Sequence, residues 1–204
     1  MKAARPVALA GMLLLTACAA TPLTQPVWPA PSDPMGLAVQ AGLTPEPVEN
    51  LTTHTHAHLD VFVDGERIVV PSAIGIDIEA IGITHELSAD GTTHEYFLPA
   101  SCPVACLSPL HTHDPTGIIH TESDKADQEP YTLGQFFTEW GVPLNAECVG
   151  EFCKTETTIA VYVDGEQVTG NPAEIKLLSH EEIAIVIGKA PSAIPDSYPF
   201  FDPA

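Results

Sequence analysis

The sequence predicts an α+β, mainly β domain built from antiparallel hairpins and one short amphipathic helix. Three observations predict it. Runs of β-branched residues are joined by Asp-Gly turns at 64–65 and 164–165, apolar residues recur at helical spacing over 133–140, and Pro-rich segments bound the patterned region. The length of 204 residues suits one domain of ordinary size, which we expect over 51–190.

The first expected segment is a Pro-rich tether over 18–50 with one short helix, for which Asp33 is the N-cap and Gly42 the end. Asp-Gly between 59–63 and 66–70 is typical of a type I′ hairpin. The other expected segments are hairpins across 83–98, 110–122, 159–168 and 175–187, and a Pro-rich tail over 191–204 whose aromatic residues pack back on the domain.

The helix is expected between Thr132 as N-cap and Gly141 as the stop. Its apolar residues fall at i, i+3, i+4 and i+7: Leu133, Phe136, Phe137 and Trp140. Such a stripe packs against a sheet, so we interpret these residues as core.

Two segments of the sequence are nearly the same. LDVFVDGE at 59–66 and IAVYVDGE at 159–166 share two valines and the Asp-Gly-Glu turn. This similarity fits two related halves, and it equally fits two hairpins with the same favourable turn. The order of hairpins, helix and closing strand also resembles a β-grasp arrangement.

The charge balance excludes two classes of partner. Seven basic residues face 27 acidic ones, a net charge of −20 with histidine neutral. So acidic a surface repels phosphate backbones, which excludes nucleic-acid binding, and it repels anionic lipid headgroups. Nine histidines are many for a chain with so few other bases.

The first residues have the pattern of a targeting segment. Lys2 and Arg5 precede an apolar run over 7–15 that is too short to span a bilayer, and the run ends in Leu-Thr-Ala-Cys at 15–18. This resembles the signal peptide and lipobox of bacterial lipoprotein precursors. The resemblance implies a signal peptide over 1–17, a lipid on Cys18 that anchors the chain to the membrane, and a place in the cell envelope outside the cytoplasm.

Four cysteines remain besides Cys18 after the signal is removed. Without Lys2 and Arg5, five basic residues face 27 acidic ones, so the charge becomes −22. In an oxidising compartment the short spacings favour two local disulfides. The pairs would be Cys102 with Cys106 and Cys148 with Cys153. The CPVAC segment at 102–106 also leaves open thiolate metal ligands or a redox pair.

Six of the nine histidines fall in two clusters with strand spacing. His54, His56 and His58 alternate with Thr55 and Ala57, so the three imidazoles share one face of a strand with Asp60. The second cluster is His111, His113 and, after a turn, His120. Two imidazoles about 7 Å apart along a strand can converge on one ion.

The loop length decides which way His120 points. A four-residue loop over 114–117 places His111 opposite His120, so that all three imidazoles and Glu122 share a face. A three-residue loop with a bulge turns His120 to the other face. The three-residue form is commoner, so we expect His111 and His113 to share a face. Whether His120 joins them depends on the register of the hairpin.

These clusters predict a metal-binding protein rather than an enzyme. Imidazole ligands suit copper or zinc, and a metal-donor or acceptor protein would be the partner. Acidic neighbours can hold the imidazoles by hydrogen bonds; the nearest are Asp60, Asp114 and Glu122.

Two alternatives stay open. One is a zinc or copper enzyme with Glu122 or Asp114 as acid or base. The other is a cell-envelope interaction module without metal, in which the histidines sense pH. We interpret the remaining histidines as structural or exposed: His85, His94 and His180.

Overall fold

The computed structural model describes residues 27–88, 91, 93–98 and 100–200. The expected signal peptide, Cys18 and the first part of the tether lie outside these residues. Among the described residues, no helix has both the length and the apolar character needed to cross a membrane.

The described residues form two short α-helices, one 3-10 helix and eleven strands. Their bounds are α1 (Pro34–Gln40), β1 (Thr53–Val63), β2 (Glu66–Ile68), β3 (Thr84–Leu87), β4 (His94–Phe97), β5 (Leu110–His111), β6 (Ile118–Ser123), α2 (Leu133–Trp140), β7 (Cys148–Val149), β8 (Phe152–Cys153), β9 (Ile159–Val163), β10 (Glu166–Val168), η1 (Pro172–Glu174) and β11 (Glu182–Ile187). The predicted fold class, α+β and mainly β, is confirmed.

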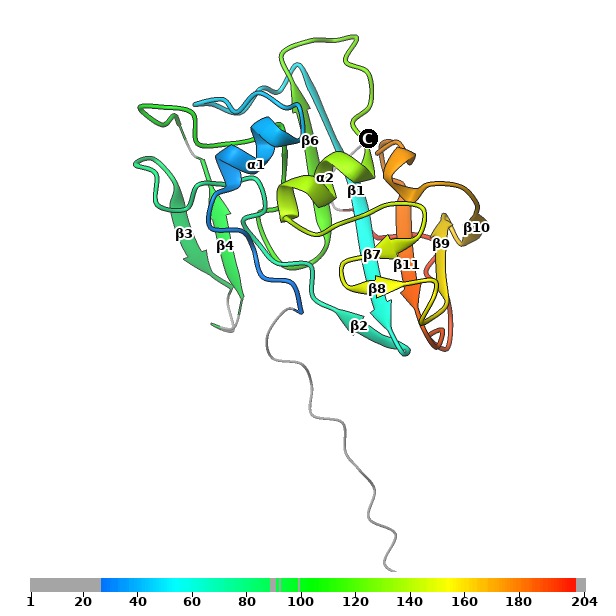
Figure 1. Ribbon diagram of the computed structural model, residues 1–204. Helices are drawn as coiled ribbons and strands as arrows, with labels where there is room; N and C mark the ends of the chain where they lie inside the picture. Colours follow the sequence, from blue (N-terminus) through cyan, green and yellow to red (C-terminus); the bar gives the residue numbers. More distant parts are fainter. Residues whose placement is uncertain (1–26, 89–90, 92, 99, 201–204) are drawn as a thin grey trace, which may run out of the picture.

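One seven-stranded sheet forms the body of the protein (Figure 1). Its order is β10-β9-β11-β1-β6-β5, and β2 pairs with β1. The pairs are antiparallel except that β1 and β11 run parallel, with His58 opposite Glu182 at one end. The order β2-β1-β11-β9-β10, with α2 between the two hairpins in sequence, agrees with the β-grasp arrangement suggested above.

The two Asp-Gly hairpins form as expected. Asp64 and Gly65 have φ of 51° and 89°, and Asp164 and Gly165 have φ of 48° and 78°. Positive φ at both central residues is the type I′ geometry that matches the twist of the strands. The two similar hairpins, β1-β2 and β9-β10, lie on opposite sides of β11.

The helices cover one face of the sheet (Figure 1). Thr132 and Gln135 form a reciprocal capping box at the start of α2, and Gly141 ends it with φ of 73°. The predicted stripe on α2 is fully buried, against residues that alternate along β1: Ala57, Leu59 and Val61. Helix and sheet thus form the main core.

Residues 27–50 differ from the expected tether because they pack on the domain. Trp28 is 9% exposed, its ring meets Trp140 edge-on at 5.7 Å, and its indole N–H donates to Glu151 at 2.8 Å. The predicted short helix is α1, with the Asp33 side chain accepting from the N–H of Gly36. The Pro-rich composition does not predict this packing, because Trp140, which donates a hydrogen bond to the carbonyl of Trp28, lies 112 residues away in sequence.

The expected hairpin across 175–187 is wrong. Residues 175–178 form no strand; instead, Leu133 N–H donates to Ile175 and Leu177 N–H donates to Tyr131, beside the start of α2. The following strand, β11, pairs with β1 and β9. Its six residues are all buried, which explains why it takes the centre of the sheet.

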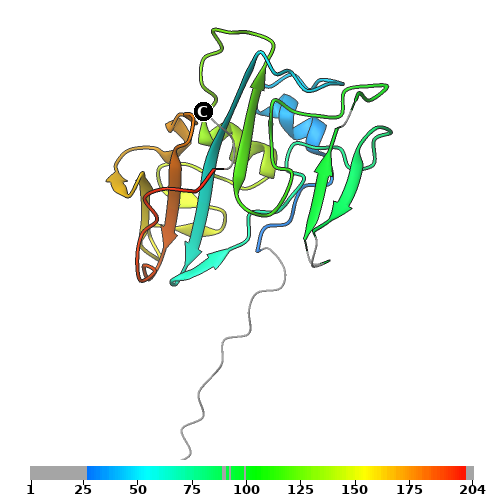
Figure 2. The same cartoon turned by 180° about the vertical axis from the view of Figure 1, so that it is seen from behind.

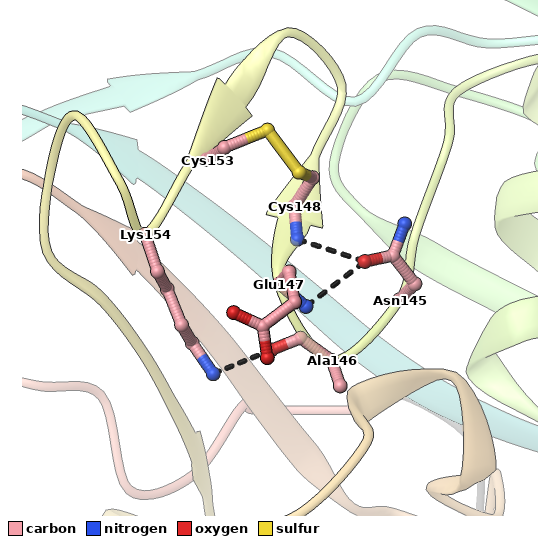
Figure 3. Close-up of a disulfide and its surroundings, with 6 residues drawn as sticks. All are labelled: Asn145, Ala146, Glu147, Cys148, Cys153 and Lys154. Carbon is pink, nitrogen blue, oxygen red and sulfur yellow. Dashed lines mark hydrogen bonds between the residues drawn. A yellow bond between two sulfur atoms is a disulfide. The ribbon is translucent and has the colours of Figure 1, made fainter.

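Both expected local disulfides are present, Cys102–Cys106 and Cys148–Cys153. The second joins β7 to β8, and Asn145 beside it accepts from the N–H of Cys148 (Figure 3). Disulfides persist in oxidising compartments and indicate a place outside the cytoplasm.

The C-terminal segment packs on the second face of the sheet, as expected for the described part of the tail (Figure 2). Ile194 joins a small cluster with Phe62 and Val186, and the ring of Tyr198 stacks on His58 at 3.8 Å. The C-terminal segment therefore covers one end of this face. The histidines of β1, β5 and β6 lie further along it.

Candidate metal centre

The sheet brings five histidines together, four of them on three neighbouring strands and His113 two residues after the end of β5. β6 lies between β1 and β5, and His120 on β6 pairs with His56 on one side and His111 on the other. We call His54, His56, His111, His113 and His120 the five-histidine centre. Five of the six histidines of the two predicted clusters thus form one group, although the clusters are separated by more than 50 residues in sequence.

The register overturns the expectation for the loop at 114–117. His111 is opposite His120, which is the four-residue alternative, so His120 shares the face of His111. Asp114 accepts from the N–H of Thr116, and Gly117 has φ of 99° with its carbonyl accepting from Leu59 N–H. Because β6 is held by β1 as well as β5, pairing with β1 fixes its face.

The first triad consists of His54, His56 and His120. The Nε2 atoms of His54 and His56 lie 3.1 Å apart. Nδ1 of His120 lies 3.2 Å from the former and 3.0 Å from the latter. An ion about 2.0–2.1 Å from all three nitrogens would lie about 1 Å out of their plane, with further coordination positions open.

The second triad consists of His111, His113 and His120, whose ligand atoms lie within 4.8 Å of one another. The carbonyl of Ser108, 2.9 Å from Nδ1 of His111, can only accept, so this Nδ1 carries hydrogen. His113 donates from Nδ1 to the carbonyl of Tyr96 in the same way. Both Nε2 atoms are therefore unprotonated in the neutral rings, and they face each other at 3.2 Å.

Glu122 lies beside the centre, on the face that the four-residue loop predicts, and it makes no hydrogen bond to the imidazoles in the described residues. Its Oε1 lies 3.8 Å from Nε2 of both His54 and His111, and its side chain is 3% exposed. Its Oε2 accepts from the N–H of Asn50. Burial, and then the charge of Glu49, raises the pKa of Glu122 to about 7.

Burial keeps two of the imidazoles neutral. It lowers the pKa of His111 well below its usual value, and the neighbouring His113 lowers it further. Burial, and then His111, lowers the pKa of His120. A neutral imidazole has a lone pair available for a metal ion, so these two rings are ready to bind near neutral pH.

The centre is graded from buried to exposed. His111 is fully buried, His113 and His120 are half-buried, and His54 is exposed. The ring of Phe97 stacks on His113 at 5.1 Å and covers it from β4. An ion therefore has access from the side of His54.

His58 does not join the other histidines, although it shares their face of β1. Its Nε2 faces the carbonyl of Thr116 at 2.9 Å, and its Nδ1 faces Glu182 at 2.7 Å. At this level of the sheet the partner on β6 is Ile118 rather than a histidine. Both ring nitrogens have oxygen partners, so His58 is not available to the centre.

Asp60 lies with His58 and not with the centre. His58, Asp60 and Glu182 are close enough to hold an ion, but Arg67 bonds Asp60 and its guanidinium reaches 3.4 Å from Nε2 of His58. We interpret this group as an internal ion-pair cluster in which Arg67 supplies the positive charge.

Two further groups singled out in the sequence lie outside the five-histidine centre. Asp114 serves the turn by accepting from Thr116. His85 and His94 pair across β3 and β4, with nitrogens 2.6 Å apart on an exposed hairpin. Neither feature contributes a ligand atom to the five-histidine centre.

Sequence reasoning missed the groups that orient the second triad. They are the main-chain carbonyls of Ser108 and Tyr96 and the ring of Phe97. Every residue has a main-chain carbonyl, so no sequence signal could have identified these two carbonyls as partners of the histidines. The pattern of hydrogen bonds to carbonyls from the far nitrogen is typical of metal-binding histidines.

Comparison with known proteins adds no family: no family model, curated protein or solved structure matches this chain. What the structure itself shows is a protein outside the cytoplasm by its disulfides, with histidine groups able to hold a metal ion.

Proposed function

We propose that this protein is a lipid-anchored metal-binding protein of the cell envelope that takes up copper or zinc at the five-histidine centre. Capture, delivery or tolerance of the metal would be its role, with another protein as donor or acceptor. The acidic surface would attract either cation.

One observation carries the proposal. His111 and His113 both donate Nδ1–H to main-chain carbonyls, and this turns their Nε2 atoms toward each other at 3.2 Å. A hydrogen bond from the far ring nitrogen is the usual support of a metal-binding imidazole, because it fixes the ring with the other nitrogen toward the ion.

The donor set supports copper(II) or zinc(II). The ligands are imidazoles with one carboxylate nearby, which suits both ions. The four cysteines among the described residues are in disulfides, and Met35, the described methionine, lies on α1. Within the part of the chain that the structure describes, the centre therefore has no sulfur ligand of the kind that favours copper(I).

Metal content is the direct test. Full-length protein purified without an affinity tag should hold copper or zinc by elemental analysis, and calorimetric titration of the metal-free protein should show binding. His111→Ala with His113→Ala should lower the affinity of the second triad more than about 100-fold.

A matched control removes two histidines elsewhere. His85→Ala with His94→Ala takes the same number of imidazoles from the exposed hairpin and should leave tight binding unchanged. Loss of tight binding in this control but not in the first variant, or absence of binding in the wild-type protein, would refute the proposal.

The lipid anchor has a separate test. The LTAC segment supports acylation of Cys18, and mass spectrometry of the processed N-terminus should find a diacylglyceryl cysteine there. Cys18→Ser should release the protein from the membrane fraction with its metal affinity unchanged. Unmodified Cys18 in membrane-bound protein would contradict the anchor.

A further inference from the structure

The five-histidine centre has two matching halves. His54-Thr55-His56 on β1 and His111-Thr112-His113, which begins at the end of β5, are the same three residues, placed on either side of β6. Within each motif the two rings meet edge-on, at 4.7 Å and 78° in the first and at 4.8 Å and 80° in the second.

His120 relates to both halves in the same way. Its ring stacks on His54 at 5.5 Å and on His111 at 5.1 Å. It meets His56 edge-on at 4.3 Å and His113 edge-on at 4.4 Å. The ring of His120 thus makes the same two kinds of contact with each half.

Glu122 is shared in the same manner. Its Oε1 lies 3.8 Å from a ring nitrogen of His54 and 3.8 Å from one of His111. Its carboxyl group lies at equal distance from both halves, and in the ionised form it would offset the repulsion between two cations.

His120 belongs to both triads. Its Nδ1 faces His54 and His56 at 3.2 and 3.0 Å, and one of its ring nitrogens lies within 4.8 Å of ligand atoms of His111 and His113. An imidazole has a second nitrogen that can bind a second ion. A single ion would use only one of these nitrogens. Two ions would use both, each completing a set of three imidazoles.

From these matched contacts and the shared His120 we infer that the centre holds two metal ions, one in each triad, joined through the ring of His120 as an imidazolate. The inference rests on the proposed function and deepens it. Each ion forms one bond to a His120 nitrogen, and the single N–H proton of that ring passes to solvent. No oxidant or reductant is involved, because both metals stay divalent.

The bridge gives the pair of ions a measurable property. With bonds of about 2.0 Å on each side of the ring, the two ions would lie about 6 Å apart. Two copper(II) ions joined by an imidazolate couple their unpaired electrons antiferromagnetically. Their electron paramagnetic resonance signal is then lost at low temperature, whereas a lone copper(II) gives one full spin.

The experiment loads the full-length, metal-free protein with copper(II). Native mass spectrometry should count two coppers per chain, and spin quantitation at low temperature should find far less than two spins. His111→Ala with His113→Ala should keep one copper with one full spin, and His54→Ala with His56→Ala should do the same. Circular dichroism checks that each variant folds.

The second of these variants protects the test, because His54 is exposed and its loss leaves the buried half intact. Two coppers with two full spins would overturn the bridge. One copper in the wild-type protein, lost in both double variants, would overturn the two-ion centre and leave metal binding standing. No copper at all would overturn the proposed function together with this inference.

Discussion

Glu139→Gln should raise the free energy of unfolding at neutral pH and flatten its dependence on pH. Glu139 lies on α2 with 0% exposure, and neither carboxyl oxygen has a hydrogen-bond partner of standard geometry among the described residues. Burial raises the pKa of this carboxyl well above its usual value, and the nearby Ser108 offsets this only in part. The folded protein therefore keeps a proton on Glu139 to a higher pH than the unfolded chain does.

The sign of the effect follows from proton linkage. The unfolded chain gives up this proton at the ordinary pKa of 4.5, whereas the folded protein keeps it to higher pH. The contribution to stability is complete below pH 4.5 and is lost as the pH rises toward the folded pKa. The loss approaches about 1.4 kcal/mol per pH unit, and glutamine at 139 removes it.

Urea unfolding of metal-free protein at pH 5, 6, 7 and 8 measures the effect. The stability of the wild-type protein relative to Glu139→Gln should fall with pH by about that slope, whereas the exposed control Glu129→Gln should follow the wild type. Other titrating groups contribute equally to both proteins and cancel in the difference. Parallel stability curves for wild type and Glu139→Gln would refute a protonated, buried Glu139.

Three further outcomes are expected. His58→Ala should keep the copper stoichiometry in native mass spectrometry but lose about 3–5 kcal/mol in urea unfolding, because it leaves the carboxylate of Glu182 buried without its partner; a lost copper would contradict the assignment. Trp28→Ala should cost about 3–5 kcal/mol while the exposed Val39→Ala costs under about 0.5, and equal effects would mean that 27–50 is a tether. Gly117→Ala should weaken metal binding in calorimetry and lower the free energy of unfolding by more than about 1 kcal/mol, because φ of Gly117 is 99° and the added Cβ would lie 2.5 Å from the carbonyl oxygen of Leu59. Wild-type affinity in this variant would show that the turn does not set the register.

Local signals in the sequence were sufficient for individual elements. The Asp-Gly turns need positive φ at adjacent residues, and the Thr132 and Gly141 caps mark the ends of α2 from within a few residues. Strand order was not accessible in this way. β11 was expected to pair with its neighbour in sequence, yet it inserts between β1 and β9, because its six buried residues need cover on both faces.

The same distinction between local signals and strand pairing applies to the five-histidine centre. Alternation along a strand correctly grouped His54 with His56 and His111 with His113. The orientation of His120 depended on a one-residue choice in a loop, which its second partner strand, β1, decides. The alternation failed for His58, because a shared face says nothing about what the neighbouring strand presents at each level.

The fold holds the nitrogens of the centre in place by groups outside it. Burial lowers the pKa of His111 and of His120, so both rings keep a lone pair near neutral pH. The carbonyls of Ser108 and Tyr96 hold the rings of His111 and His113 in their orientation, and the packed core of α2 against β1 holds the strands. These side chains therefore need little rearrangement to bind an ion, because their supports lie on rigid elements of the fold.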